Sequence, residues 1–117
     1  MKSILRVVVL LLISGGVLPP MAWGQPVWEQ QDQAISRLGE LNGIALNCDY
    51  PAETMRMKKA LIANVPKKRG IGQLFDDKTH ESFLNFIQQG TTCPDEGELQ
   101  GWIDEAIITV KQVYGVN

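Results

Sequence analysis

The side chains that could do acid–base or nucleophilic chemistry are few in this chain and lie far apart. The single histidine, His80, stands close to three acidic residues, which is typical of an exposed helix position. A serine nucleophile needs a base within reach, and Ser36 and Ser82 both lack the G-x-S-x-G context that exposes such a hydroxyl. Glycine loops that cradle phosphate are also missing from the sequence. These residues predict a protein that is not an enzyme.

Metal-binding side chains are equally sparse. Met55 and Met57 carry soft thioethers that suit Cu(I). Residues two apart on a helix face different directions, however, so we expect at least one of them to fill the core or a contact surface. The sequence predicts no metal site and no cofactor.

The first 24 residues have the features of a cleaved signal peptide. Lys2 and Arg6 precede an unbroken apolar run over residues 7–13, and Ala22-Trp23-Gly24 supplies small residues for a signal peptidase. This apolar run is far shorter than the roughly 20 residues of a membrane span, although an uncleaved anchor is the alternative. We expect a periplasmic or otherwise secreted protein whose residues 25–117 form a single domain.

Cleavage changes the charge balance of the chain. Two of the 11 cations leave with the signal peptide, so nine remain against 13 acids, a net charge of −4. A general nucleic-acid binder would be basic overall, so the composition argues against that class of partner.

Two cysteines, Cys48 and Cys93, remain after export, and each stands just ahead of a predicted helix. In an oxidising compartment the default is one disulfide, and a free or metal-binding thiol pair is the alternative. The bond would close a loop of about 46 residues, which the chain-entropy model values at roughly 4 kcal/mol. Because C-x-x-C spacing is absent, we expect a structural disulfide that pins two helix beginnings together.

Six cations follow one another with no acid between Glu53 and Asp76. They are Arg56, Lys58, Lys59, Lys67, Lys68 and Arg69. Such a surface could dock an acidic protein, a lipid headgroup at a membrane surface or another polyanion. A solvated helix face is the alternative, and so is attraction to the acidic last helix within the fold or between copies. We take these six residues as the candidate partner-binding surface.

Helical periodicity recurs four times and no segment reads as a strand, so the fold class is all-α, a small bundle of about four helices. The first helix covers about 27–47, with a buried stripe at Ile35, Leu38, Leu41 and Ala45. Gly39 and Gly43 within it mark either a close helix approach or two incidental glycines. We also expect Trp28 to pack on the bundle, with an exposed partner contact as the alternative.

The sequence predicts the boundaries of the other three helices, with two alternatives for the start of the third. The second begins at Pro51 and ends before Pro66. Its expected apolar side comprises Ala52, Met55, Leu61, Ile62 and Val65. Residues 66–70 form a turn, and the third helix starts either after a cap at Asp76-Asp77 or continuously from Ile71, stopping at Gly90. The last helix runs from about Pro94 to Gly115, with its core stripe at Leu99, Trp102, Ile103, Ala106, Ile107, Val110 and Val113.

An export signal, a short helical domain and two widely spaced cysteines together resemble two classes of small exported protein. They are similar to HdeA-like acid-stress chaperones and to type VI secretion immunity proteins. The resemblance concerns architecture, with Cys48 and Cys93 as its only residues, so no functional residue is carried over. We expect a binding or accessory protein that acts through protein–protein contact. An acid-stress chaperone and a carrier of a small ligand or metal are the alternatives.

Overall fold

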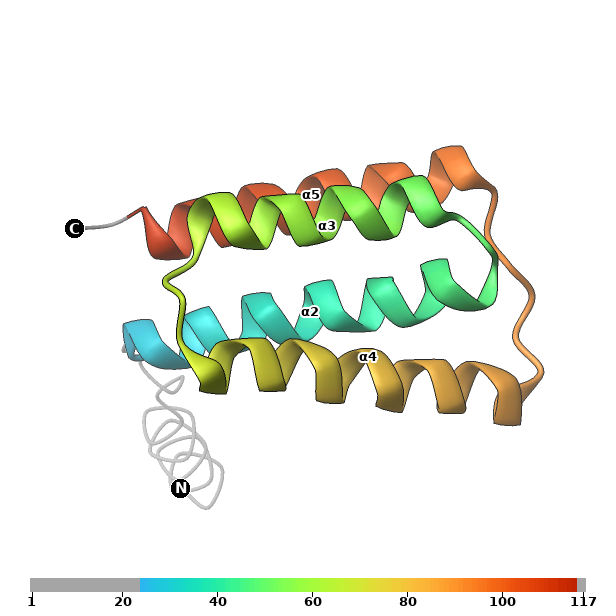
Figure 1. The fold of residues 1–117 in the computed structure, drawn as a ribbon, viewed down its shortest axis with the longest axis horizontal. Helices are drawn as coiled ribbons and strands as arrows, with labels where there is room; N and C mark the ends of the chain where they lie inside the picture. Colours follow the sequence, from blue (N-terminus) through green and yellow to red (C-terminus); the bar gives the residue numbers. More distant parts are fainter. Residues whose placement is uncertain (1–23, 116–117) are drawn as a thin grey trace, which may run out of the picture.

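The computed structural model describes residues 24–115, in which four helices follow one another (Figure 1). They are α2 (Val27–Asn47), α3 (Pro51–Asn64), α4 (Arg69–Gln89) and α5 (Glu96–Tyr114). These residues contain no strand, which confirms the predicted all-α bundle of four helices. Nearly all of the predicted signal peptide lies outside the described residues.

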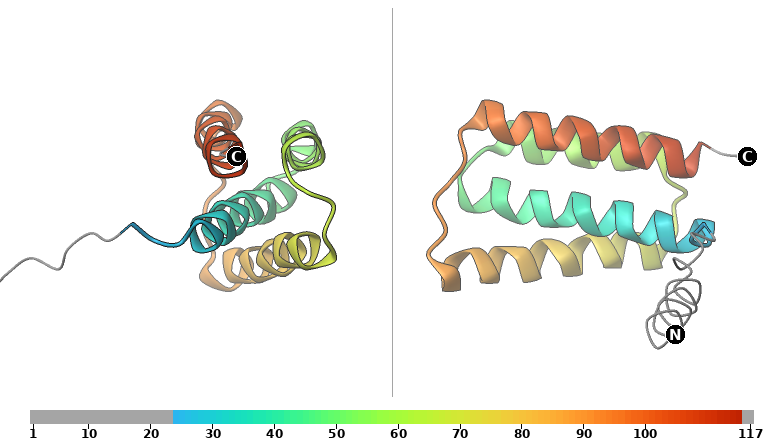
Figure 2. Two further views of the ribbon diagram at one scale, coloured as in Figure 1. Left: turned by 90° about the vertical axis from the view of Figure 1, so that its left-hand side faces the viewer. Right: turned by 180° about the vertical axis from the view of Figure 1, so that it is seen from behind.

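Helix α2 is the element that holds the bundle together. Helix α4 runs along one side of it, while α3 and α5 lie next to each other on the other side (Figures 1 and 2). Among the described helices, α4 packs against α2 but against neither α3 nor α5. As a result, α3 and α4 are neighbours in sequence that diverge in space.

The core of the bundle is built from α2 and α5. The four stripe residues predicted for α2 are buried, and so are Leu99, Ile103, Ala106 and Val110 of α5. Full burial of a Leu or Ile side chain stabilises a fold by roughly 1.5–3 kcal/mol. The two helices with the clearest periodicity in sequence therefore contribute most of the buried apolar surface, as predicted.

Gly39 and Gly43 lie where α2 and α4 approach each other closely. A Cβ atom at Gly39 would stand 2.8 Å from Lys78 Cβ, and one at Gly43 would stand 2.6 Å from Ser82 Oγ. Both distances are shorter than van der Waals contact, so only glycine fits without a shift of α4. The interpretation of these glycines as a close-approach site is thus confirmed.

Hydrogen bonds supplement this close approach, because Phe75 is the only fully buried side chain that α4 supplies. Ser82 Oγ donates to the carbonyl oxygen of Glu40 at 2.7 Å, and Asn47 Nδ2 donates to that of Phe83 at 3.0 Å. Side-chain hydrogen bonds therefore contribute to the attachment of α4 to α2, together with the apolar contacts of Phe75, Ile71 and Leu74.

The start of α4 differs from both predicted positions. The helix begins at Arg69, preceded by Lys68 in an extended conformation (φ −121°, ψ 133°) that makes no side-chain capping bond. Arg69 and Gly70 thus belong to the helix instead of the predicted turn, and Asp76 lies inside the helix where it caps nothing. The predicted end is right, since Gly90 adopts the left-handed conformation (φ 61°) typical of a helix C-terminus.

The apolar side predicted for α3 is partly wrong. Three of its expected residues are exposed: Ala52, Met55 and Ile62. The buried face instead carries Glu53 and Met57, which are 3% and 0% exposed, with Leu61 half-buried one turn further on. Met55 and Met57 do point in different directions, as expected from their spacing.

Cys48 and Cys93 form the predicted disulfide, with their Cα atoms 5.7 Å apart. It joins the α2–α3 connection to the α4–α5 connection and so fixes the beginnings of α3 and α5 relative to each other. Beside it, the Tyr50 hydroxyl donates to the carbonyl oxygen of Pro94 at 2.9 Å.

Candidate functional site

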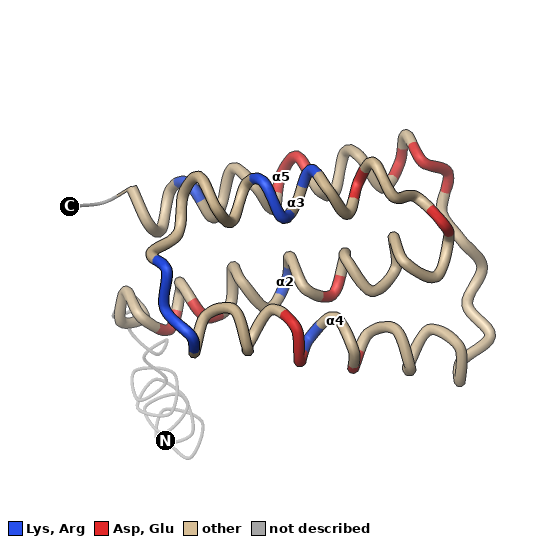
Figure 3. The backbone as a smooth tube through the Cα atoms, in the orientation of Figure 1, with Lys and Arg blue, Asp and Glu red and all other residues tan. Residues whose placement is uncertain are grey.

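The six candidate cations separate into two environments. Arg56 pairs with Asp104 of α5. The other five are exposed: Lys58 and Lys59 on α3, Lys67 and Lys68 on its connection to α4, and Arg69 at the start of α4. Figure 3 shows basic residues along α3 and at this connection. In the described part of the chain, none of these five exposed cations forms an ion pair.

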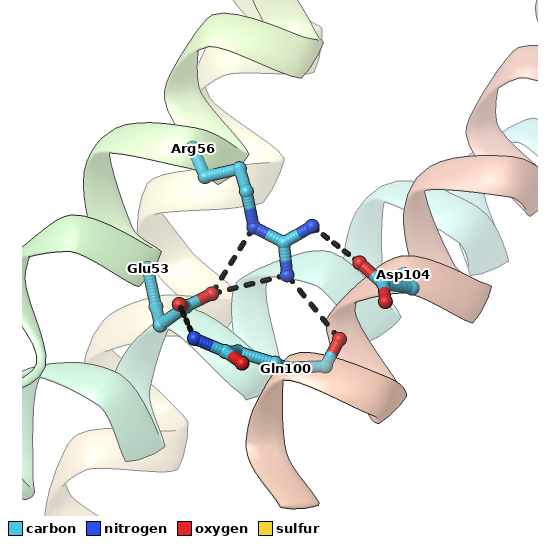
Figure 4. Close-up of polar contacts among 4 residues, drawn as sticks. All are labelled: Glu53, Arg56, Gln100 and Asp104. Carbon is cyan, nitrogen blue, oxygen red and sulfur yellow. Dashed lines mark hydrogen bonds and ion pairs between the residues drawn. The ribbon is translucent and has the colours of Figure 1, made fainter. Parts of the chain in front are cut away.

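Arg56 belongs to a polar network that joins α3 to α5 (Figure 4). Its Nε donates to Glu53 Oε2 at 3.1 Å, its Nη2 donates to the carbonyl oxygen of Gln100 at 3.2 Å, and its Nη1 pairs with Asp104. Gln100 Nε2 in turn donates to the second carboxylate oxygen of Glu53 at 2.9 Å. The buried carboxylate of Glu53 is therefore fully engaged.

Burial acts to lower the pKa of Arg56, but its hydrogen bonds to Asp104 and Glu53 outweigh that effect and raise the pKa. The guanidinium stays charged and is occupied by partners within the fold. For Arg56 the structure therefore matches the alternative named above, attraction to the acidic last helix within the fold. Arg56 stabilises the packing of α3 on α5.

An apolar groove of about 340 Å³ lies between the C-terminal half of α3 and the start of α4. Its apolar lining comprises Leu61, Ile62, Val65, Ile71 and Phe75. Its charged lining comprises Lys58, Lys67, Lys68 and Asp76. Phe75 closes the floor at 4% exposure, while Ile62 at the edge is 71% exposed. We call this groove and its cations, with Lys59 and Arg69 beside it, the groove surface.

The groove exists because α3 and α4 each pack on other helices instead of on each other. Pro66 cannot continue α3, and Val65 and Lys68 on either side of it are extended. This short connection separates the two helices, so a groove lined by their apolar side chains remains between them.

Positive charge is concentrated where the connection from α3 enters α4. Lys67, Lys68 and Arg69 lie at the beginning of α4, whose first turn holds no acid. The N-terminus of a helix is its positive end, and a cation there costs about 0.3–1 kcal/mol instead of stabilising it. The fold therefore tolerates an unfavourable local arrangement at this point.

Other residues singled out in the sequence are placed as follows. The Ser82 hydroxyl donates a hydrogen bond from α4 to α2, and His80 is exposed. Trp28 is 64% exposed, so the expectation that it packs on the bundle is wrong. In the range 24–115, no three His, Cys, Asp or Glu side chains are grouped so that they could hold a metal ion, and no helix is long and apolar enough to cross a membrane.

No family model, curated protein or solved structure matched this chain. The resemblance to HdeA-like chaperones and to immunity proteins therefore stays a prediction.

Proposed function

We propose that this chain is an exported, non-enzymatic protein that binds another protein through the groove surface. The observation that carries the proposal is the apolar groove between α3 and α4 with unpaired cations at its edge. Fully desolvated apolar anchors surrounded by a polar rim are the usual anatomy of a protein–protein contact.

The exposed cations suit the rim of such a contact. Lysines at an interface edge add little affinity when solvated, but they steer an acidic partner and reject a basic one. The apolar lining, from Phe75 at the floor to Ile62 at the edge, would provide the affinity. Both components lie on the same face, which supports binding as the function of that face.

A catalytic alternative has less support from the same residues. Both sulfurs are joined in the disulfide, and the Ser82 hydroxyl is committed to the Glu40 carbonyl. The groove itself is lined by lysines, apolar side chains and one carboxylate, without a paired nucleophile and base.

The test is capture of a partner from a native extract with the oxidised protein and two charge-reversed variants. The first variant, Lys67→Glu/Lys68→Glu/Arg69→Glu, changes the groove surface. The matched control reverses three cations elsewhere: Arg37, Lys78 and Lys111. We expect the first variant to lose the partner and the control to retain it. Equal capture by both variants would contradict the proposal.

An acid-stress chaperone is a second candidate, favoured by the network at Arg56. This network holds α3 on α5 through two carboxylates, Glu53 and Asp104. An acid-stress chaperone loosens and exposes apolar surface at a pH of about 2–3, and α3, which ion pairs hold on α5, is the helix that would loosen. Binding of an apolar dye and suppression of client aggregation at that pH are expected for a chaperone, and an unchanged fold would end this candidate.

A further inference from the structure

We infer that the partner segment is an amphipathic helix that lays two apolar side chains into the groove. One flank of this helix is acidic and faces α3 and the Pro66 connection, and the flank that faces Asp76 is neutral. The inference rests on the proposed function and specifies the chemistry of its partner.

The mode of recognition follows from the backbone around the groove. An extended peptide adds to the free edge of a sheet, and residues 24–115 contain no strand that could offer one. The walls of the groove are two helices whose backbone groups are paired within them, except for the free N–H groups in the first turn of α4. Side-chain packing of an amphipathic helix is the recognition mode that such walls permit.

The openness of the groove argues against a small apolar ligand. A volume of about 340 Å³ lies at the lower end of the range for ligand pockets. Ile62 is 71% exposed at its edge, so an acyl chain bound there would remain partly in water. A partner helix covers such an edge with its own flank, which removes Ile62 from water together with the groove floor.

The length of the groove sets the number of anchors. The α3 wall extends from Lys58 to Val65, which at the helical rise of 1.5 Å per residue is about 10 Å, or two turns. Two apolar side chains at positions i and i+4 are about 6 Å apart and fit within this length.

The charges at the edge set the polarity of the flanks. Lys58 lies on the α3 wall and Lys67 and Lys68 lie at the connection, whereas Asp76 lies on the α4 wall. A carboxylate beside Asp76 would be repelled, and one beside the lysines would be attracted and would also face the positive end of α4. The partner helix therefore carries its acids on one side only.

The experiment uses the oxidised mature chain, labelled with ¹⁵N, and three short alanine-based helical peptides. One has leucines at i and i+4 and glutamates on one flank, the second has lysines in place of the glutamates, and the third has alanines in place of the leucines. We expect the first peptide to shift amide signals within residues 58–76 and to bind at least about tenfold more tightly than the other two. Ile62→Ala and Lys67→Glu should each weaken this binding several-fold, while Ile108→Ala, at an exposed site on α5, should not.

Two results would overturn the inference. One is equal binding of the three peptides, or shifts centred outside residues 58–76. The other is binding to phosphatidylglycerol vesicles that depends on Ile62 and Lys67 while the acidic peptide fails to bind, since the occupant would then be a lipid surface. If the acidic peptide fails but the charge-reversed variant still loses a captured protein, the helix inference falls and the proposed function stands.

Discussion

Replacing Lys68 by aspartate should stabilise the fold while it weakens binding at the groove surface. Lys68 occupies the N-cap position of α4, already has the extended backbone that a capping residue needs, and makes no capping bond. Aspartate there could accept a hydrogen bond from a free backbone N–H group of the first turn.

Two effects set the size of the change. A capping side chain contributes about 0.5–2 kcal/mol relative to alanine. Exchanging a cation for an anion at the positive end of a helix contributes about 0.3–1 kcal/mol for each charge. Together these contributions raise the free energy of unfolding of Lys68→Asp by about 1–4 kcal/mol. In a domain of this size, each 1 kcal/mol raises Tm by roughly 4–8 °C.

The assay is urea unfolding of the oxidised protein followed by far-ultraviolet circular dichroism. Lys68→Asn supplies a cap without a charge, and Lys68→Ala supplies neither, so we expect stability to increase in the order Lys, Ala, Asn, Asp. The same Lys68→Asp variant should bind the acidic peptide more weakly than the native protein. An aspartate variant no more stable than the alanine variant would refute our interpretation of the start of α4.

Three further predictions concern the bundle. Gly43→Ala should destabilise the fold by about 1–3 kcal/mol, because the added Cβ would push α4 away from α2. Gly101→Ala should stabilise it by up to about 1 kcal/mol, because a Cβ atom there meets open space. Urea unfolding of both variants measures these changes. A double-mutant cycle of Arg56→Met and Glu53→Gln should give a coupling free energy of about 1–3 kcal/mol, because removal of the cation leaves a buried carboxylate without its ion-pair partner. A coupling free energy near zero would contradict this prediction. Burial, with a smaller effect from the carboxylate of Asp32, raises the pKa of Tyr114 above 10.0. The contribution of the protonated Tyr114 hydroxyl to the free energy of unfolding is therefore fully present below pH 10.0 and is lost as the pH rises above that value. Tyr114→Phe should therefore lose less stability on this alkaline side, as measured by urea midpoints on both sides of pH 10.0.

Sequence pattern was sufficient where one apolar stripe repeats without interruption. In α2 and α5 the stripes containing Leu38 and Ile103 are long and face one side, so periodicity identified the core. The disulfide followed from an even cysteine count in a chain expected to be exported. For Gly43 the sequence could only state two alternatives, because close approach depends on the position of α4.

The rest depended on contacts between distant residues. A carboxylate occupies a buried position of α3 at Glu53, and it is tolerated there because Arg56 and Gln100 bond to it. A pattern of apolar residues does not reveal such a position. The apolar face predicted for α3 therefore differs from the face that is buried in the structure. Gly70 and Gly72 lower helix propensity in the first turn of α4 and obscured its start. Pro66 marks the end of α3 in the sequence, but the groove also requires that α3 and α4 pack on other helices, and no local pattern indicates that arrangement.

Site-specific photocross-linking from position 62 tests the central claim, that the groove surface contacts a partner protein. A benzophenone side chain replaces Ile62 in one variant and Ile108, which is 53% exposed on α5, in another. Both variants are irradiated in native extract, and the cross-linked segments are sequenced by mass spectrometry. We predict a product from position 62 alone, joined to a helical segment with acids on one flank. Equal products from both positions, or none from position 62, would contradict the account.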